Sequence, residues 1–239
     1  KLDHLNPGGS KKDRAARGVI EAARASGALA PGQTVVELTS GNMGTGLAIV
    51  CGALGHPFVA VMSRGNTPER ARMLAALGAE VILVDQAPGS RPGEVSGADL
   101  DLVEAEARRI TSDRAAFRAD QFALPGNPAA HEATTGPELW AQSGGTLTAF
   151  ADFAGSGGTY AGTIRALKAR GAVRGYVVEP EGAAVLAGEA VTDPAHPIQG
   201  GGYARRLALM EGVPVDGHLS VTGDEARQAA QDLARIEGI

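Results

Sequence analysis

Short apolar runs and longer amphipathic stretches alternate along the chain. The apolar runs are rich in β-branched residues, which is typical of buried strands, and they cover residues 34–38, 57–62, 80–85, 149–154, 176–179 and 218–221. Between them, helical spacing covers residues 10–29, 47–54, 67–77, 99–110, 131–142, 160–168 and 224–237. Strand and helix in alternation predict parallel sheets covered by helices on both faces, so the predicted fold class is α/β.

Glycine and proline mark the connections between these elements. Residues 86–98 and 181–202 are predicted as long loops, and residues 119–126 as irregular structure. Thr67 and Pro68 carry the signals of a helix start, and Gly78 carries that of a helix end. A length of 239 residues suits two small domains or one large one.

Composition and charge exclude several classes of protein. Hydrophobic residues make up 44% of the chain, enough for a core, and the net charge of −5 comes without a basic run, which argues against a nucleic-acid partner. No apolar run reaches the length of a membrane span, so we expect a cytoplasmic protein with no membrane partner. The single cysteine, Cys51, cannot form an internal disulfide and is predicted to lie in the core. The five histidines lack ligand spacing, so no metal site is expected.

The stretch from Asn6 to Arg14 breaks regular structure and then opens a helix. Ser10 is predicted as the N-cap, with Lys11 and Lys12 in the first turn. The positive end of a helix dipole lowers the pKa of a lysine, and the neutral amine that results could hold an aldehyde cofactor. From these residues alone, an ordinary solvated lysine pair after a turn is the favoured interpretation.

Two glycine-rich turns each join a strand to a helix. The segment Gly155-Ser156-Gly157-Gly158-Thr159 offers backbone N–H groups, two hydroxyls and a helix N-terminus, which together favour a phosphate. It lacks the lysine of a Walker A loop and the spacing of a dinucleotide fingerprint, and a plain tight turn is about as plausible from the residues alone. The segment Thr39-Ser40-Gly41-Asn42 suits a carboxylate, or is simply a capped helix start.

Several blocks of the chain resemble, in the same order, those of the cysteine synthase and cystathionine β-synthase family. This family comprises fold-type II enzymes that use pyridoxal 5′-phosphate (PLP). In the first half of the chain, the blocks are residues 6–14 (family form Asn-Pro-Gly-Gly-Ser-x-Lys-Asp-Arg) and 39–44 (Thr-Ser-Gly-Asn-Thr-Gly). They continue with residues 120–140 (Gln-Phe-x-Asn-Pro-x-Asn-Pro, then His and Thr-Thr-Gly-Pro-Glu-Ile-Trp), 155–159 (Gly-Thr-Gly-Gly-Thr) and 198–202 (Ile-Gln-Gly-Ile-Gly). Shorter matches lie at residues 221–225 and 237–239.

The resemblance implies a fold similar to the tryptophan synthase β subunit. We expect two three-layer α/β/α domains with mostly parallel sheets, over residues 1–118 and 119–239. The lysine before Asp-Arg, here Lys12, would carry PLP as a Schiff base and act as the catalytic base. Cofactor-binding residues would be Asn42 at the ring oxygen, Gly155, Ser156, Gly157, Gly158 and Thr159 at the phosphate, and Gly200. Substrate-binding residues would be Thr39, Ser40, Gly41, Asn42 and Gln121.

The reaction implied is a β-replacement on an O-activated L-serine. A cysteine synthase would convert O-acetyl-L-serine and sulfide to L-cysteine and acetate, and the family form implies a homodimer. A cystathionine β-synthase or another synthase of β-substituted alanines, with a different thiol or nucleophile, remains open. So do a non-catalytic relative that binds PLP or a partner, and a plain nucleotide-binding domain in which Lys12 is idle.

The chain departs from the family form at a few positions. Met43, Gly201 and Tyr203 replace a threonine, an isoleucine and a phenylalanine, so one donor to the substrate carboxylate is expected to be missing. His131 and Trp140 are interpreted as packing residues. The chain begins without Met and stops just after a helical pattern, so we expect it to lack both ends, including the family's later Ser-rich turn that bonds the pyridine nitrogen.

Overall fold

The computed structural model describes residues 1–93, 95–194 and 196–238. Glu94 and Ala195 of the two predicted long loops, and Ile239 of the 237–239 match, lie outside the described residues. The chain divides into two compact units, Lys1–Ala130 and His131–Ile239. The expected domain boundary after residue 118 stays a prediction.

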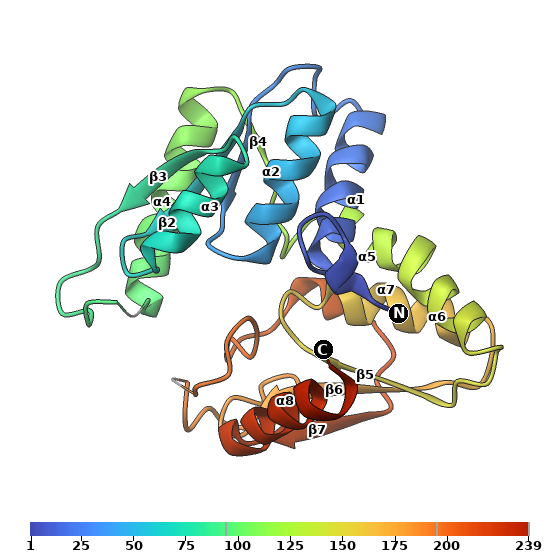
Figure 1. Ribbon diagram of the computed structural model, residues 1–239. Coiled ribbons are helices and arrows are strands. Elements are labelled where there is room, and N and C mark those ends of the chain that lie inside the picture. The colour runs from blue at the N-terminus through green and yellow to red at the C-terminus, as the bar shows by residue number, and fades with distance from the viewer. Residues whose placement is uncertain (94, 195, 239) are drawn as a thin grey trace. The chain divides into compact units, whose positions relative to one another are not determined.

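The first unit is built on a parallel sheet in the order β3-β2-β1-β4 (Figure 1). Its strands are β1 (Val35–Leu38), β2 (Phe58–Ser63), β3 (Glu80–Val84) and β4 (Phe117–Arg118). In the register of the sheet, Val35 of β1 lies opposite Phe58 on one side and Phe117 on the other. The two-residue strand β4 was not predicted from the sequence.

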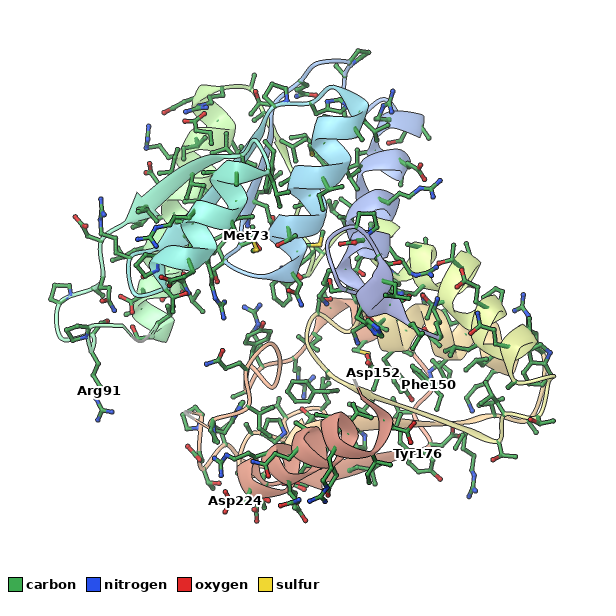
Figure 2. The ribbon with its side chains drawn as sticks, in the orientation of Figure 1. Met73, Arg91, Phe150, Asp152, Tyr176 and Asp224 are labelled. Carbon is green, nitrogen blue, oxygen red and sulfur yellow. The ribbon has the colours of Figure 1, made fainter. Side chains whose placement is uncertain are left out.

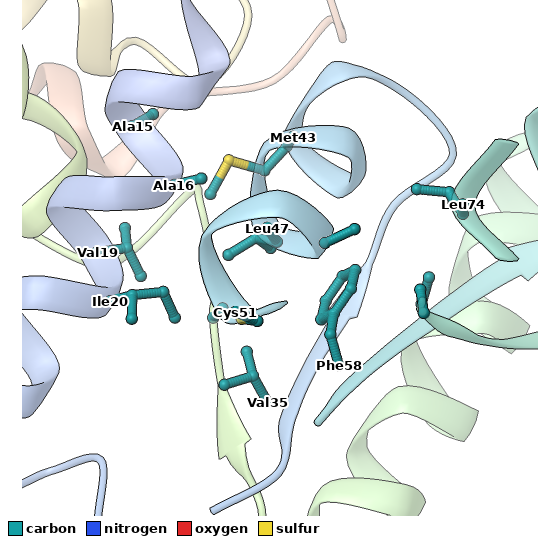
Figure 3. Packing of buried hydrophobic residues seen from close by; sticks show 14 of the residues in the cluster. Ala15, Ala16, Val19, Ile20, Val35, Met43, Leu47, Cys51, Phe58 and Leu74 are labelled. Carbon is teal, nitrogen blue, oxygen red and sulfur yellow. The ribbon is translucent and has the colours of Figure 1, made fainter. Parts of the chain in front are cut away.

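Helices cover both faces of this sheet. Val35 packs in a cluster with residues of α1 (Lys12–Ala25), α2 (Asn42–Leu54) and α3 (Pro68–Ala76) (Figure 3). Val36, the next residue of the strand, packs instead with α4 (Gly97–Asp113). Successive strand residues point to opposite faces, so this alternation produces the predicted three layers in the first unit. Cys51 is fully buried in the cluster that Val35 forms with α1, α2 and α3 (the α1–α2 cluster below), as predicted. Burial raises the pKa of its thiol to about 12.

Two glycines let other backbone segments approach α1 closely. A Cβ on Gly18 would lie 2.5 Å from the Gly126 carbonyl oxygen of the short helix α5 (Gly126–Ala130). A Cβ on Gly46 of α2 would lie 3.1 Å from the Lys12 carbonyl oxygen. The helices α1, α2 and α5 therefore pack backbone against backbone, which fixes the start of α1 against α2. The chain enters α1 through a short 3₁₀ turn, Asp3–Leu5.

The second unit has a parallel sheet in the order β5-β6-β7. Its strands are β5 (Ala149–Phe153), β6 (Arg174–Pro180) and β7 (Gly217–Val221). Its helices are α6 (Gly136–Gln142), α7 (Gly158–Lys168) and α8 (Gly223–Glu237). A π-helical turn covers His131–Thr135, and a 3₁₀ turn covers Ala208–Met210. Phe150 and Tyr176 come from neighbouring strands (Figure 2), and the Phe150 ring lies 6.1 Å from that of buried Tyr160 on α7. The predicted helix over residues 131–142 thus begins as a π turn.

The predicted α/β class with parallel sheets is confirmed. Every strand pairing in the described residues is parallel. Among the helices that the structure describes, none combines the length and apolarity needed to cross a membrane.

Candidate active site

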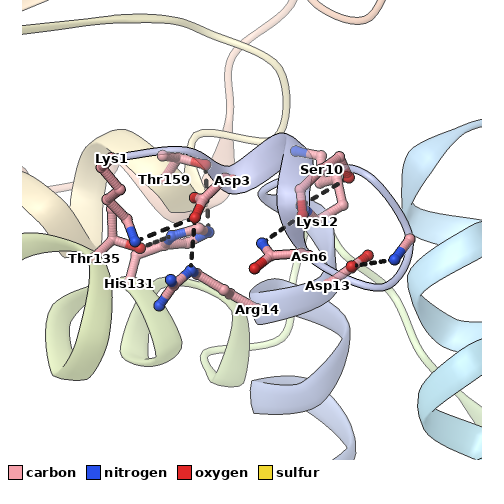
Figure 4. A network of polar contacts seen from close by, with 11 residues as sticks. Lys1, Asp3, Asn6, Ser10, Lys12, Asp13, Arg14, His131, Thr135 and Thr159 are labelled. Atoms are coloured by element: carbon pink, nitrogen blue, oxygen red, sulfur yellow. Dashed lines mark hydrogen bonds and ion pairs between the residues drawn. The ribbon is translucent and has the colours of Figure 1, made fainter. Parts of the chain in front are cut away.

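The turn before α1 is held by its own polar groups. The helix begins at Lys12 and its N-cap residue is Lys11, so the prediction that Ser10 is the N-cap is wrong by one residue. The Ser10 hydroxyl nevertheless accepts the backbone N–H of Lys12 at 3.2 Å, because the chain is already helical at Lys11. The Asn6 amide donates to the Ser10 carbonyl at 3.0 Å, and the Asp13 carboxylate accepts the Gly8 N–H at 2.6 Å (Figure 4). Lys12 is therefore the first residue of a helix that begins at a fixed turn.

The turn 39–42 joins the carboxyl end of β1 to the start of α2. Thr39 is buried, and its hydroxyl accepts the Gly44 N–H at 2.9 Å. A hydroxyl that accepts one bond can still donate its proton, so Thr39 can donate to a carboxylate. Gly41 is the N-cap of α2 and Asn42 its exposed first residue. Backbone N–H groups at this helix start add to the favourable site for an anion.

Lys12 and the turn 39–42 belong to neighbouring helix starts. Gly46 lies one helical turn after Asn42, and its missing side chain is what lets the Lys12 carbonyl approach α2. Within the first unit, the backbone of the predicted cofactor-bearing lysine therefore packs against the first turns of the helix that the predicted carboxylate turn begins.

The side chain of Met43 lies in the hydrophobic core. Its side chain is 2% exposed and packs with Ala15, Ala16 and Leu47 (Figure 3). At this position the chain therefore offers an apolar contact instead of a hydroxyl, and the hydroxyls of Thr39 and Ser40 are those that the turn retains.

Arg70 of α3 lies beside the same turn and was missed by sequence reasoning. Its guanidinium donates to the Ser40 carbonyl at 3.3 Å, and a Cβ on Gly41 would lie 3.9 Å from its Nη1 atom. A guanidinium here adds positive charge beside a predicted carboxylate site. The sequence gives no signal for this contact, because Arg70 reads as an ordinary first-turn residue of a helix.

The Gln121 carbonyl is held by a buried side chain, and a buried carboxylate lies on β1 near Arg118. The Asn127 amide donates to the Gln121 carbonyl at 2.8 Å. Glu37 is 1% exposed and lies on β1, two residues before Thr39. Arg118 forms an ion pair with Glu37 at 3.2 Å. Burial raises the pKa of the Glu37 carboxyl well above its ordinary value, and the charge of Arg118 opposes this shift.

The second unit contains the predicted phosphate turn, between β5 and α7. Gly157 is the N-cap of α7 with a left-handed φ of 84°, and no side chain caps this helix start. Ser156 and Thr159 are 3% and 7% exposed. A Cβ on Gly155 would lie 2.9 Å from the Gly200 carbonyl oxygen, so Gly200 lies against this turn.

The loop around Gly200 needs Gly201 to be a glycine. A Cβ on Gly201 would lie 2.6 Å from the Ala154 carbonyl oxygen, which accepts the Gly202 N–H at 2.9 Å. An isoleucine, which the resemblance leads one to expect here, does not fit this backbone approach. The departure at Gly201 therefore follows from how tightly the loop packs on the end of β5.

A buried histidine supports the phosphate turn from behind. His131 is fully buried, in line with its interpretation as a packing residue, but it also has a polar role: Nε2 lies 3.3 Å from the Thr159 hydroxyl and Nδ1 lies 2.8 Å from the Thr135 hydroxyl (Figure 4). Its position in a π turn is typical of functional sites. Trp140 packs against Gly145 and Gly171.

The turn has the features of a cofactor phosphate site. It combines a helix N-terminus, a glycine with left-handed backbone, two buried hydroxyls and a neighbouring loop that a single Cβ would push away. The family model described as "Pyridoxal-phosphate dependent enzyme" matches residues 1–239.

The chain belongs to the pyridoxal-phosphate dependent enzyme family. A cysteine synthase of Staphylococcus aureus (strain Mu50 / ATCC 700699) is 38% identical over 242 aligned residues, which cover 100% of this chain and 74% of that protein. The crystal structure of an O-ureido-L-serine synthase matches with a TM-score of 0.86 and 36% identity, covering 100% of this chain and 72% of the other. The O-acetylserine-dependent cystathionine β-synthase from Helicobacter pylori matches with a TM-score of 0.86 and 32% identity, covering 100% and 74%.

The family membership confirms the PLP cofactor and the fold-type II architecture that the resemblance implied. The individual roles of the site residues stay predictions. Of these residues, Lys12, Gln121 and the turn 39–42 lie in the first unit, and Gly200 with the turn 155–159 lies in the second.

Proposed function

We propose that this PLP enzyme makes L-cysteine from O-acetyl-L-serine and sulfide, and releases acetate. The observation that supports the proposal is the packing of the Lys12 backbone against Gly46 of α2, the helix that begins at the predicted carboxylate turn 39–42. The 38% identity to a cysteine synthase across the whole chain supports the choice of this reaction among β-replacements.

Each site residue has a role in holding the cofactor. Lys12 would hold its aldehyde carbon, Asn42 its ring oxygen, and the backbone N–H groups and hydroxyls of residues 155–159 its phosphate, with Gly200 beside it. When bound, PLP supplies an electron sink that makes the α-proton of an amino acid acidic.

The chain's own residues bind the amino acid and move its proton. The turn 39–42 binds the substrate carboxylate through the hydroxyls of Thr39 and Ser40 and the backbone N–H groups of Gly41 and Asn42, and Gln121 contacts the same substrate. Once it no longer holds the cofactor, the Lys12 amine takes the proton from Cα. The Cβ–O bond breaks and acetate leaves with its electron pair. Sulfide then forms the Cβ–S bond, and Lys12 returns the proton to Cα.

We further propose a cytoplasmic homodimer. The resemblance to the family supports the dimer, and the single buried thiol of Cys51 fits a reducing compartment. Light scattering of the purified protein tests the oligomeric state.

The proposal is tested by the visible absorption of the purified protein with PLP. We expect a band from lysine-bound cofactor that shifts on addition of O-acetyl-L-serine, and L-cysteine as the product after sulfide is added. Lys12→Ala should lose both the band and the product, whereas Lys11→Ala should keep both. A wild-type band that ignores O-acetyl-L-serine refutes this donor, and homocysteine in place of sulfide then tests a cystathionine β-synthase.

A further inference from the structure

A buried carboxylate lies at the end of β6 in the second unit. Glu179 is 4% exposed, and each of its two oxygens accepts a backbone N–H, that of Leu186 at 3.0 Å and that of Ala187 at 3.0 Å. The Nδ1 atom of His218, on the neighbouring strand β7, lies 3.9 Å from the Oε2 atom of Glu179. One carboxylate therefore joins the sheet to residues 181–202, the long loop that follows β6 (the β6 loop below).

The segment that Glu179 holds is a compact turn. The Gly188 N–H donates to the Val185 carbonyl at 3.1 Å, which closes the turn through its own backbone. The N–H groups of Leu186 and Ala187 lie between these two residues in the chain, and both donate to the carboxylate. Because half-buried N–H groups that lose their acceptor are costly, a side chain without two acceptors at position 179 would loosen this turn.

The first half of the β6 loop is closed a second time at its base. The Gly182 carbonyl accepts the N–H groups of Thr192 at 2.8 Å and of Asp193 at 3.0 Å. Together with Glu179, it fixes the loop at two points. Asp193 lies three residues before His196 in the sequence, so the place where the first half ends determines where the second half begins.

The second half of the β6 loop returns to the end of β6 and to the phosphate turn. His196 Nε2 lies 2.7 Å from the Gly202 carbonyl oxygen, and the Gly202 N–H donates to the Ala154 carbonyl at 2.9 Å. A Cβ on Gly202 would lie only 2.4 Å from the Cγ atom of Pro180. Between these contacts, the Gly200 carbonyl lies against the phosphate turn. The loop therefore leaves and regains the same strand end, and it carries the predicted cofactor glycine between.

We infer that Glu179 is a positioning residue for the cofactor: by holding the N–H groups of Leu186 and Ala187, its carboxylate fixes the β6 loop so that Gly200 stays against the phosphate turn. The inference rests on the proposed function for the role of that turn in binding the PLP phosphate. Glu179 acts through the loop backbone and is not a catalytic residue. A loop that is already held in its binding conformation loses little entropy when the cofactor binds, so this carboxylate should slow the release of PLP.

The decisive variant is Glu179→Gln. Its amide keeps one acceptor oxygen and sets an NH₂ group against the second N–H donor, so only one of the two bonds can form. In the holoenzyme we expect about 10-fold faster hydrogen exchange at the Leu186 and Ala187 amides, and about 10-fold faster release of PLP into a solution that traps it. The release is followed by the loss of the visible cofactor band, and neither measurement requires turnover.

Two further variants separate positioning from general stability. Asp216 lies at the other end of β6, where its carboxylate accepts the Gly175 N–H at 2.7 Å and pairs with Lys168 at 2.6 Å. Asp216→Asn weakens the same unit at the far end of the strand, so it should lower Tm and leave the release of PLP as in wild type. Glu179→Asp keeps two acceptor oxygens on a shorter side chain, and its release of PLP should be faster than in wild type and slower than in Glu179→Gln.

The result that overturns the inference is a wild-type rate of PLP release in Glu179→Gln, or a release that is as fast in Asp216→Asn as in Glu179→Gln. If Glu179→Gln does not fold, Glu179→Asp decides, because a wild-type rate of release in that variant refutes the role of the carboxylate. A wild-type enzyme that binds PLP and makes no cysteine counts against the proposed function, while the release of PLP from the Glu179 variants still decides whether this carboxylate holds the cofactor loop.

Discussion

The contact between α2 and the start of α1 leads to a prediction about one glycine. An alanine at position 46 would place its Cβ 3.1 Å from both the Ala16 Cβ and the Lys12 carbonyl oxygen, and 3.2 Å from the Asp13 Cα. Alanine in a helix is favoured over glycine by ~1 kcal/mol, whereas overpacking a tight contact costs ~1–3 kcal/mol. We expect Gly46→Ala to lower the free energy of unfolding by up to about 2 kcal/mol.

Gly52 on the same helix provides a matched control. A Cβ at position 52 has no atom within 4 Å, so Gly52→Ala should raise the free energy of unfolding by about 0.5–1 kcal/mol. Thermal unfolding monitored by circular dichroism distinguishes the two variants, since ~1 kcal/mol shifts Tm by ~2–4 °C in a protein of this size.

The same substitution should also affect catalysis. To relieve the contact, the first turn of α1 must move by a few tenths of an ångström, and Lys12 moves with it. Because small displacements of a reacting group cost large factors in rate, we expect kcat to fall about 10-fold in Gly46→Ala and to stay unchanged in Gly52→Ala. Equal stabilisation in both variants, with equal kcat, would show that the close approach of α1 and α2 does not exist.

Three other predictions concern the lysine, the phosphate turn and a helix cap. Lys12→Ala should abolish cysteine formation and the visible cofactor band, with Lys11→Ala as the active control. In Gly157→Ala, a left-handed φ of 84° is combined with a Cβ only 2.6 Å from a Met210 side-chain atom, so PLP affinity measured by titration should fall at least about 10-fold. Gly212 is the control: its φ is 68°, a Cβ there would have no atom within 4 Å, and Gly212→Ala should keep wild-type affinity. Backbone and serine donors hold the pKa of Asp99 below its ordinary value, so the ionised carboxylate stabilises the folded protein above pH ~4, and this stabilisation is lost as the pH falls below that. Asp99→Asn should therefore be less stable than wild type at pH 7. Urea titrations should show a smaller difference between the two proteins at pH 3.

The layered fold could be predicted because its strands and helices have clear patterns. β2 is a continuous apolar run, and α3 begins with a threonine followed by a proline at its first position. The strand β4 could not be predicted, because a strand of two residues, Phe117 and Arg118, is too short to show any periodicity. These residues form a strand only because they pair with β1. The π turn at His131 likewise depends on tertiary packing, since its residues fit an ordinary helical pattern.

The site shows the same limit at the level of single contacts. The turns at residues 39–42 and 155–159 are visible in the sequence because glycines and hydroxyls are concentrated there. Glu37 and Arg118 are separated by most of the first unit's sequence, and each reads alone as an ordinary charged residue. Only the parallel pairing of β1 with β4 brings them together.

The buried thiol of Cys51 can report transient opening of the α1–α2 cluster. Only the thiolate reacts with disulfides and alkylating agents, and a fully buried thiol with a pKa of about 12 presents almost none of it at neutral pH. Labelling of native protein must therefore proceed through states in which the α1–α2 cluster has come apart. The rate at which a colourless reagent such as iodoacetamide modifies this one cysteine, followed by mass spectrometry, then measures how often the lysine-bearing helix leaves its place. An enzyme that handles sulfide and cysteine would gain protection from mixed disulfides by the same burial.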